Sequence, residues 1–128
     1  MEKEYYRLVS LNVKSGTDAV PTAELAMAVG NKKQQVTAEG SGVVDAAFKA
    51  IELLVESHGE LLLYSVNSIT TGTDSQGEVT VRLSLSGRIV NGLGIDTDIV
   101  IASAKAYISA LNKLHRKMEV EHPQHSGI

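Results

Sequence analysis

Cysteine and tryptophan are absent from this 128-residue chain, and aromatic residues make up only 4% of it. Without cysteine there can be no disulfide framework, no thiolate metal site and no cysteine nucleophile, and we expect a cytoplasmic protein. Because aromatics are scarce, the core must be built mainly from Val, Ile, Leu and Ala. The length is that of one domain and is sufficient to bury such a core.

The sequence also gives no sign of a membrane-spanning segment or of nucleic-acid binding. No apolar run approaches the ~20 residues of a membrane-spanning helix, and no apolar segment follows the charged stretch Met1–Glu4, so we expect no signal peptide. Basic residues are scattered and the net charge is −3, whereas nucleic-acid-binding domains usually carry a basic patch. We therefore expect neither a membrane nor a nucleic-acid partner.

Catalytic and metal-binding patterns are missing as well. The four histidines do not form a His-Glu-x-x-His motif, and there is no serine nucleophile elbow. We therefore predict no catalytic residue, no metal site and no cofactor, which favours a binding or regulatory domain over an enzyme.

The first half of the chain predicts three strands and a helix. Apolar residues alternate in segments 5–14 and 22–29, and a more polar strand follows over 32–38. Gly30-Asn31 between the last two tolerates positive φ and predicts a hairpin. Apolar residues then recur at helical spacing over 43–57, with charged residues on the opposite face. We expect His58-Gly59 to close this helix.

The second half repeats that order. Strands are predicted over 61–69 and 78–85, separated by a loop over 72–77, and a third begins at Arg88 after a Ser86-Gly87 turn. A second amphipathic helix is expected from about 97 to 116. Residues 119–128 are polar and without periodicity, so we expect a disordered or loosely packed tail.

These patterns predict an α+β fold of two βββα units related by a pseudo-twofold axis. The single domain spans 1–118, with unit one at about 4–58 and unit two at about 60–117. One helix covers only one face of a three-stranded sheet, so each unit alone is marginal. The apolar or weakly polar positions on the remaining faces, such as Ala26, Ala28 and Ser84, suit an intermolecular contact and predict a homodimer.

A Gly-x-Gly precedes each predicted helix, at Gly40–Gly42 and at Gly92–Gly94. Two interpretations are open: the glycines make a tight turn from strand to helix, or they let a ligand approach the free N–H groups of the first helical turn. The missing third glycine argues against a dinucleotide site.

The two helix starts differ in charge. The first has one acid, Asp45, whereas the second begins with Asp96-Thr97-Asp98, whose carboxylates already meet the helix dipole. The carboxylate of a small zwitterion would therefore prefer the first helix. Its ammonium would need an acceptor, either Asp96 or backbone carbonyls, although Asp96 is equally interpretable as an ordinary capping acid.

Longer segments resemble a known family. Residues 73–79, 92–99 and 102–108, together with 40–48, closely resemble the regulatory domain of 2-isopropylmalate synthase. The resemblance covers about residues 5–116, and the segments of the second half are far more specific than either Gly-x-Gly alone.

The resemblance implies a regulatory function. Members of this family consist of two βββα units, dimerise and bind L-leucine as an allosteric feedback inhibitor between the units, near the dimer interface. The parent enzyme is an acyltransferase of leucine biosynthesis that condenses acetyl-CoA with 2-oxoisovalerate in a metal-dependent TIM barrel. This chain contains no such barrel, so the catalytic domain would be a partner.

Carried over residue by residue, the resemblance places effector-binding residues at both helix starts, on the strand that opens unit two and on the loop after it. They are Gly40, Gly42, Val43, Ala46, Tyr64, Ser68, Ser75, Gly77, Gly92, Gly94, Ile95 and Asp96. One departure is Val43, where many members have proline, which would pre-set the first helical turn.

Three alternatives compete with a leucine-binding domain. Citramalate synthases carry a similar domain that senses isoleucine, and moving one methyl group is worth only ~1–3 kcal/mol, so the sequence does not separate the two effectors. The domain could serve dimerisation only. An unrelated α+β enzyme or nucleic-acid module would need a reactive cluster or basic face, and the sequence offers neither.

Overall fold

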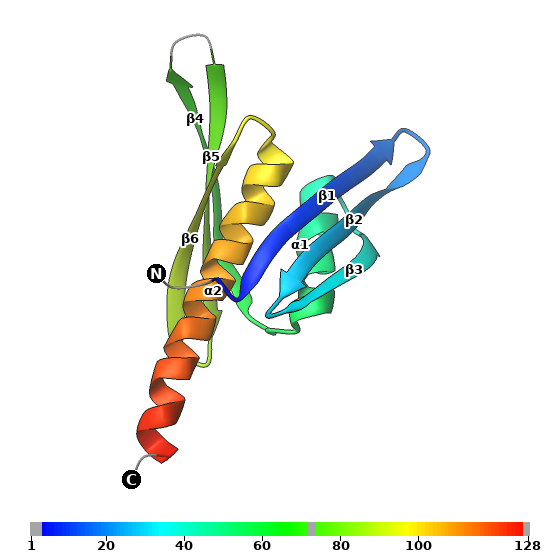
Figure 1. Cartoon of the computed structure of the whole chain (residues 1–128). Coiled ribbons are helices and arrows are strands. Elements are labelled where there is room, and N and C mark those ends of the chain that lie inside the picture. The colour runs from blue at the N-terminus through cyan, green and yellow to red at the C-terminus, as the bar shows by residue number, and fades with distance from the viewer. Residues whose placement is uncertain (1–3, 72–73, 127–128) are drawn as a thin grey trace.

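The computed structural model describes residues 4–71 and 74–126, which form two βββα units (Figure 1). Unit one contains β1 (Tyr6–Gly16), β2 (Ala19–Val29), β3 (Lys32–Glu39) and α1 (Val43–Val55), and unit two contains β4 (Glu60–Thr71), β5 (Asp74–Leu85), β6 (Arg88–Asp96) and α2 (Ile99–Ser126). This confirms the α+β fold and the repeated element order. No helix in the described parts of the chain is long and apolar enough to cross a membrane.

Each unit has a three-stranded antiparallel meander, sheet A in the order β1-β2-β3 and sheet B in the order β4-β5-β6. The predicted hairpin turns are confirmed. Gly30 has a φ of 63°, and Ser86 and Gly87 have φ values of 52° and 83°. Positive φ at both central residues of the Ser86-Gly87 turn, and at Gly30, the first central residue of the β2–β3 turn, matches the right-handed twist of the flanking strands.

Strand boundaries in unit two differ from the prediction. β5 begins at Asp74, so Ser75 and Gly77 lie in a strand and not in a loop. β6 continues to Asp96, so Gly92 and Gly94 lie inside a strand and do not form a turn before the helix. The two Gly-x-Gly motifs are therefore not equivalent.

The positions that correspond between the two units are found from the helix starts, Val43 and Ile99, which are 99 − 43 = 56 residues apart. With that offset, Gly40 corresponds to Asp96 and Gly42 to Asp98.

The glycines of β6 serve helix packing. A Cβ at Gly92 would overlap the carbonyl oxygen of Ala106, and a Cβ at Gly94 would overlap that of Ala102. Both alanines are fully buried on α2. α2 therefore lies directly against the backbone of β6, an approach that only glycine permits.

The ends of both helices also correct the prediction. α1 ends at Val55 and Glu56 takes the left-handed conformation at its end, so the helix closes before the predicted His58-Gly59. The Glu52 carboxylate stabilises this end because it accepts hydrogen bonds from the Ser57 hydroxyl and the backbone N–H of His58. α2 continues to Ser126, so the predicted tail is helical up to that residue.

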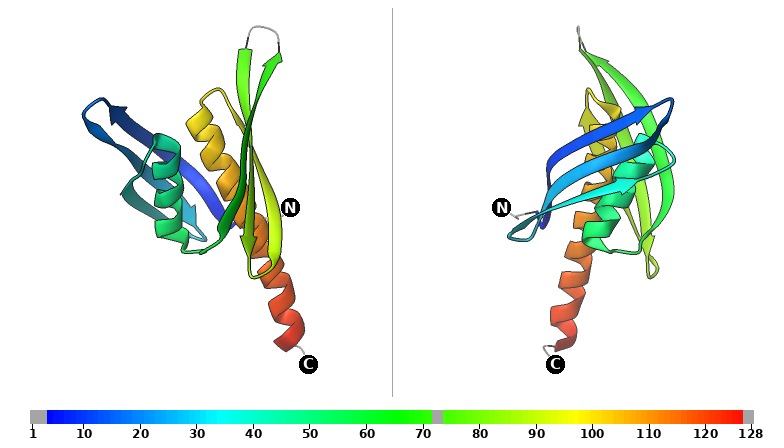
Figure 2. Two further views of the ribbon diagram at one scale, coloured as in Figure 1. Left: turned by 180° about the vertical axis from the view of Figure 1, so that it is seen from behind. Right: turned by 90° about the vertical axis from the view of Figure 1, so that its right-hand side faces the viewer.

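The units pack with opposite orientations. In Figure 1, sheet A lies in front of α1, whereas α2 lies in front of sheet B, and both helices begin toward the upper end of the molecule; Figure 2 shows the same arrangement from two further sides. The two helices pack against each other, and α2 also lies beside β1, the first strand of the other unit. The Tyr6 backbone bonds to the Asn112 side chain of α2, and the ring of Tyr64 on β4 meets Phe48 of α1 edge to face.

Candidate functional site

The start of α1 is open. Its N-cap is Gly42, which has an extended backbone with φ −156° and offers no side-chain hydrogen bond to the helix. A Cβ placed on this glycine would meet nothing within 4 Å. The first-turn N–H groups of a helix lack internal partners and carry a partial positive charge. This start therefore has the electrostatics and the space to accept a carboxylate.

The turn before α1 is closed by Asp45. Its carboxylate accepts the backbone N–H of Ser41 at 2.9 Å and pairs with Lys49 Nζ at 3.0 Å. The hydrogen bond from Ser41, followed by that from Lys49, holds the pKa of Asp45 below its ordinary value. A Cβ at Gly40 would come within 2.6 Å of this carboxylate, so the turn requires glycine there.

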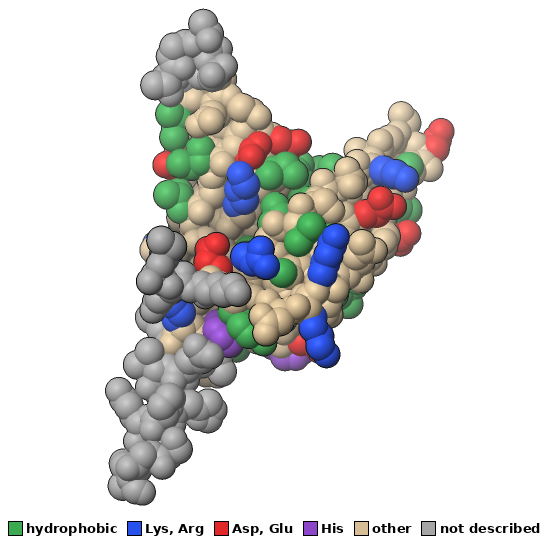
Figure 3. All heavy atoms as spheres, viewed as in Figure 1, with side chains coloured by type: hydrophobic (Ala, Val, Ile, Leu, Met, Phe, Trp, Pro, Cys, Tyr) green, Lys and Arg blue, Asp and Glu red, His purple; other side chains and the backbone are tan. Residues whose placement is uncertain are grey.

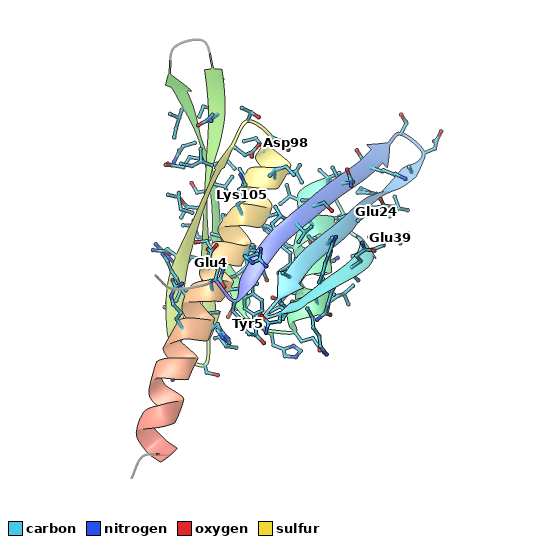
Figure 4. All side chains as sticks on the ribbon, in the orientation of Figure 1. Glu4, Tyr5, Glu24, Glu39, Asp98 and Lys105 are labelled. Atoms are coloured by element: carbon cyan, nitrogen blue, oxygen red, sulfur yellow. The ribbon has the colours of Figure 1, made fainter. Side chains whose placement is uncertain are left out.

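The start of α2 is capped by its own acids, as the sequence predicted. Asp98 Oδ1 accepts the backbone N–H groups of Val100 at 2.8 Å and Ile101 at 3.3 Å. Figure 4 shows Asp98 just before the upper end of α2 and Lys105 further along the helix. The Asp98 carboxylate therefore occupies the helix end that remains free in α1.

Asp96 already has partners for both carboxylate oxygens. Oδ1 accepts the backbone N–H of Asp98 and Oδ2 accepts Lys105 Nζ, each at 2.9 Å. The hydrogen bond from the Asp98 backbone and then that from Lys105 lower the pKa of Asp96. The geometry favours the interpretation of Asp96 as an acid that organises the turn, and leaves backbone carbonyls as the better acceptors for a ligand ammonium.

Tyr64 connects β4 to both helices. Its hydroxyl shares a 2.7 Å hydrogen bond with Ser103 Oγ on α2, and its ring lies 5.8 Å from that of Phe48 on α1. The side chain is still 37% exposed. Tyr64 therefore lies where the two units meet and keeps an accessible surface there.

Strand register brings further predicted residues onto one face of sheet B. Ser68 pairs with Gly77, which pairs with Asp96 on β6, and Tyr64 lines up with Gly92 through the central strand. Directly opposed residues share a face, and here it is the face that α2 covers. Because side chains alternate along a strand, Ser75 shares this face.

Some predicted residues are set apart. Ile95 alternates onto the outer face of sheet B and is 40% exposed. Gly77 faces inward, but a Cβ there would overlap the side chain of Ile99 at the start of α2. Gly92 and Gly94 are similarly covered by the α2 backbone. The structure thus gives these glycines a packing role, and their contact with a ligand stays a prediction.

Two surface hollows can be described, and none of the twelve predicted residues lines either. One, of about 440 Å³, lies on the outer face of sheet A around Ala26, and the other, of about 530 Å³, lies beside the second half of α1 around Leu53. Within the described residues there is no group of three or more His, Asp or Glu side chains that could hold a metal ion.

Sequence reasoning did not identify four residues that shape this region: Phe48, Ile99, Ser103 and Lys105. All four lie on helices, and each contacts a residue of a strand that is at least nine positions away in the sequence. Ser103 carried a usable signal, since it is a polar residue between two alanines on the inward side of a helix, where a hydroxyl needs a partner.

The chain matches a known family over most of its length. A family model described as the LeuA allosteric (dimerisation) domain matches residues 1–115. The chain belongs to this family.

The LeuA-type domain also has close relatives among full-length proteins. It is 59% identical over 122 residues to the 2-isopropylmalate synthase of Nitrosomonas europaea and 61% identical over 125 residues to that of Burkholderia cenocepacia. The matches cover 95% and 98% of this chain but only 24% of each relative. The chain therefore spans about a quarter of the length of these enzymes and corresponds to their allosteric region.

Proposed function

We propose that this domain binds L-leucine and, as part of a longer chain, regulates a 2-isopropylmalate synthase by feedback inhibition. The observation that carries the proposal is the open, glycine-capped start of α1 in a domain of an allosteric family. The proposal includes a cytoplasmic location and a catalytic domain as partner.

The contrast between the helix starts supports one orientation of the ligand. The leucine carboxylate would accept N–H groups after Gly42, because the equivalent groups in α2 already bond to Asp98. The leucine side chain would extend toward the apolar surface that Tyr64 and Val66 expose on β4. Leucine has nine non-hydrogen atoms, and small ligands can gain up to ~1.5 kcal/mol per atom. A micromolar affinity, which needs ~8 kcal/mol, is within reach.

A homodimer is the second part of the proposal. The edge strand β4 exposes large apolar side chains on both of its faces, here called the β4 row, each 37–45% accessible: Leu61, Leu62, Leu63, Tyr64 and Val66. Uncovered apolar edge strands promote aggregation unless a partner covers them. Figure 3 shows one side of the molecule, with hydrophobic side chains in green along sheet B. Since the family is described as a dimerisation domain, we assign the covering surface to a second copy.

Isoleucine remains the competing effector, as in citramalate synthases. The relatives described above are 2-isopropylmalate synthases, which favours leucine. A domain used for dimerisation only would form the same dimer and ignore both amino acids.

Thermal melting with and without millimolar leucine, isoleucine, valine or lysine tests the effector directly. A ligand at ~100 times its Kd stabilises the folded state by ~2.7 kcal/mol, a rise in Tm of roughly 10 °C for a domain of this size. We expect this rise with leucine. A larger rise with isoleucine would assign the domain to the citramalate type, and no rise with any amino acid would leave dimerisation only.

The variant Gly42→Leu tests the location of the site. The space around Gly42 and its extended backbone allow a leucine side chain without strain, so the variant should fold and dimerise but lose the leucine-dependent rise. Gly16→Leu is the matched control, because its Cβ would meet only Ala19 at an ordinary 3.9 Å in the β1–β2 hairpin. Normal leucine binding by Gly42→Leu would exclude the α1 start as the site.

The dimer surface is tested by light scattering of Leu63→Lys, because Leu63 is exposed on the face of β4 opposite to the proposed leucine contacts Tyr64 and Val66. A charge on the β4 row should yield a monomer, whereas Val20→Lys, at a 56% exposed position on β2, should remain dimeric. A dimer in both variants would place the interface elsewhere.

A further inference from the structure

The start of β1 is attached to α2 by one buried side chain. Asn112 Oδ1 accepts the backbone N–H of Tyr6 at 2.8 Å, and Asn112 Nδ2 donates to the carbonyl of the same residue at 2.9 Å. Asn112 is 3% exposed and is one of two buried polar side chains in the described part of the chain. Its amide thus satisfies both backbone groups of one strand residue, as a neighbouring strand would.

Aromatic rings reinforce this attachment. The ring of Tyr5 stacks on that of His115 with a centroid distance of 4.0 Å and an interplanar angle of 15°. Tyr6 meets both rings edge to face, and the backbone N–H of Gly30 donates to the Tyr5 carbonyl at 2.8 Å. Figure 4 shows Tyr5 at the lower end of β1, beside α2. The first residues of unit one are therefore held jointly by β2 and by the helix of unit two.

The corresponding junction on the other side of the molecule is covalent. Residues 56–59 connect the end of α1 to the start of β4. With the offset of 56, Asn112 corresponds to Glu56 (112 − 56 = 56), the residue at which α1 stops and this connection begins. No chain joins α2 to β1, because they belong to opposite ends of the domain. The Asn112 amide therefore supplies by hydrogen bonding what the 56–59 segment supplies covalently.

We propose that this amide bridge between Asn112 and Tyr6, here called the β1 latch, is a conformational device that couples effector binding to the start of β1. The inference rests on the proposed function, because the predicted effector site lies between the two units. The 56–59 segment restrains one side of the inter-unit contact permanently. The β1 latch restrains the other side reversibly, so the state of the latch sets how the units face one another.

Coupling of this kind is reciprocal: if a closed latch favours the effector, the effector must favour the closed latch. Leucine should therefore slow hydrogen exchange of the Tyr6 amide in the wild-type domain. Opening the latch should weaken leucine binding although Asn112 lies outside the predicted site. If the β1 latch had a merely structural role, its loss would lower Tm without changing leucine affinity.

The experiment compares Asn112→Leu, which keeps the size of the side chain but removes both hydrogen bonds, with wild type. Calorimetry gives leucine affinity, and exchange measurements give protection of the Tyr6 amide. We expect at least a 10-fold faster exchange at Tyr6 and a 5- to 20-fold weaker leucine affinity. Asn91→Leu is the matched control at an exposed position of β6, where the lost hydrogen bond is the one that Asn91 accepts from Arg82 within unit two. It should bind leucine like wild type.

Each outcome decides between the two proposals. If wild type binds leucine and Asn112→Leu binds it equally well, the latch is purely structural and the inference fails alone. If wild type shows no leucine binding, the proposed function and the inference fail together. Should Asn112→Leu not fold, Asn112→Asp takes its place, since it keeps an acceptor for the Tyr6 N–H and loses the donor. Unchanged leucine affinity in Asn112→Asp would likewise overturn the proposal that the β1 latch is coupled to the effector.

Discussion

The two units start their helices differently, although the element order is the same. Asp98 precedes α2 and its carboxylate accepts two backbone N–H groups of the first turn, whereas Gly42 precedes α1 and has no side chain that could accept one. An acidic cap stabilises a helix and also occupies its anion-binding end. The comparison suggests that unit two uses this position for stability and unit one keeps it available for a ligand.

The contact of each helix with the third strand of its unit differs as well. Gly92 and Gly94 let α2 lie against the β6 backbone, while the equivalent positions of β3 are Val36 and Ala38. Unit two therefore packs by backbone proximity and unit one through side chains. The unit that carries the longer helix is thus also the one whose helix-to-strand packing depends on glycine.

The largest effect is expected where the packing of unit two is blocked. In Gly92→Val a side chain would overlap the backbone of α2 at Ala106 and Ala110, so the helix must move away from the strand. We expect a loss of more than ~4 kcal/mol, or no folded protein. Urea unfolding gives the value, with Gly42→Val as control. Near-equal stability of the two variants would contradict the proposed packing difference.

Removing the cap of α2 should have an intermediate effect. Asp98→Ala leaves the N–H groups of Val100 and Ile101 without their acceptor and should cost ~1 kcal/mol, a fall in Tm of roughly 4 °C. Thermal melting measures this change. The leucine response should persist, because this cap belongs to the other helix start. Loss of the response would show that the effector contacts α2.

Acid should weaken both turns in a similar way. The pKa values of Asp45 and Asp96 lie below their ordinary value of 3.8 in the folded state. The native protein consequently binds fewer protons than the unfolded chain, so this stability is present above about pH 4 and is lost as pH falls further. Tm measured between pH 5 and pH 2 should fall less steeply in the double variant Asp45→Asn, Asp96→Asn. Identical slopes would show that these carboxylates do not contribute.

The smallest effect on stability is expected when unit one is given the cap of unit two. Gly42→Asp should change stability by only a few tenths of a kcal/mol, the usual difference between glycine and aspartate caps. The new carboxylate would occupy the N–H groups proposed for leucine, so the leucine-dependent rise in Tm should disappear. Gly42→Ala, which adds no charge, should keep most of it. A full response in Gly42→Asp would contradict the assigned orientation of the ligand.

Local patterns in the sequence were sufficient for the elements and for several turns. Alternation identified β2, and the positive-φ preference of Gly30 and Gly87 located two hairpins. The acids at the start of α2 indicated a capped helix. These features depend on residues within a few positions of each other, where spacing and backbone preference act directly.

Longer-range features were misjudged because they depend on which strand lies beside which helix. The Gly-x-Gly of β6 matched that of residues 40–42 in sequence, yet one packs against a helix and the other precedes one. Ile95 was grouped with Asp96, but strand alternation separates them onto opposite faces. The end of α2 was also placed too early, because the polar segment after residue 116 has no apolar periodicity.

By itself the sequence determined the order βββα twice, the location of the hairpins and, through family resemblance, an allosteric domain. Only the tertiary structure decided how the units face each other, which glycines a helix covers, and that Asn112 bonds to Tyr6 across a separation of 106 residues. The physical reason is that periodicity and turn preference are local properties of the chain. Strand register, close approach of backbones and satisfaction of buried polar groups depend on residues that only folding brings together.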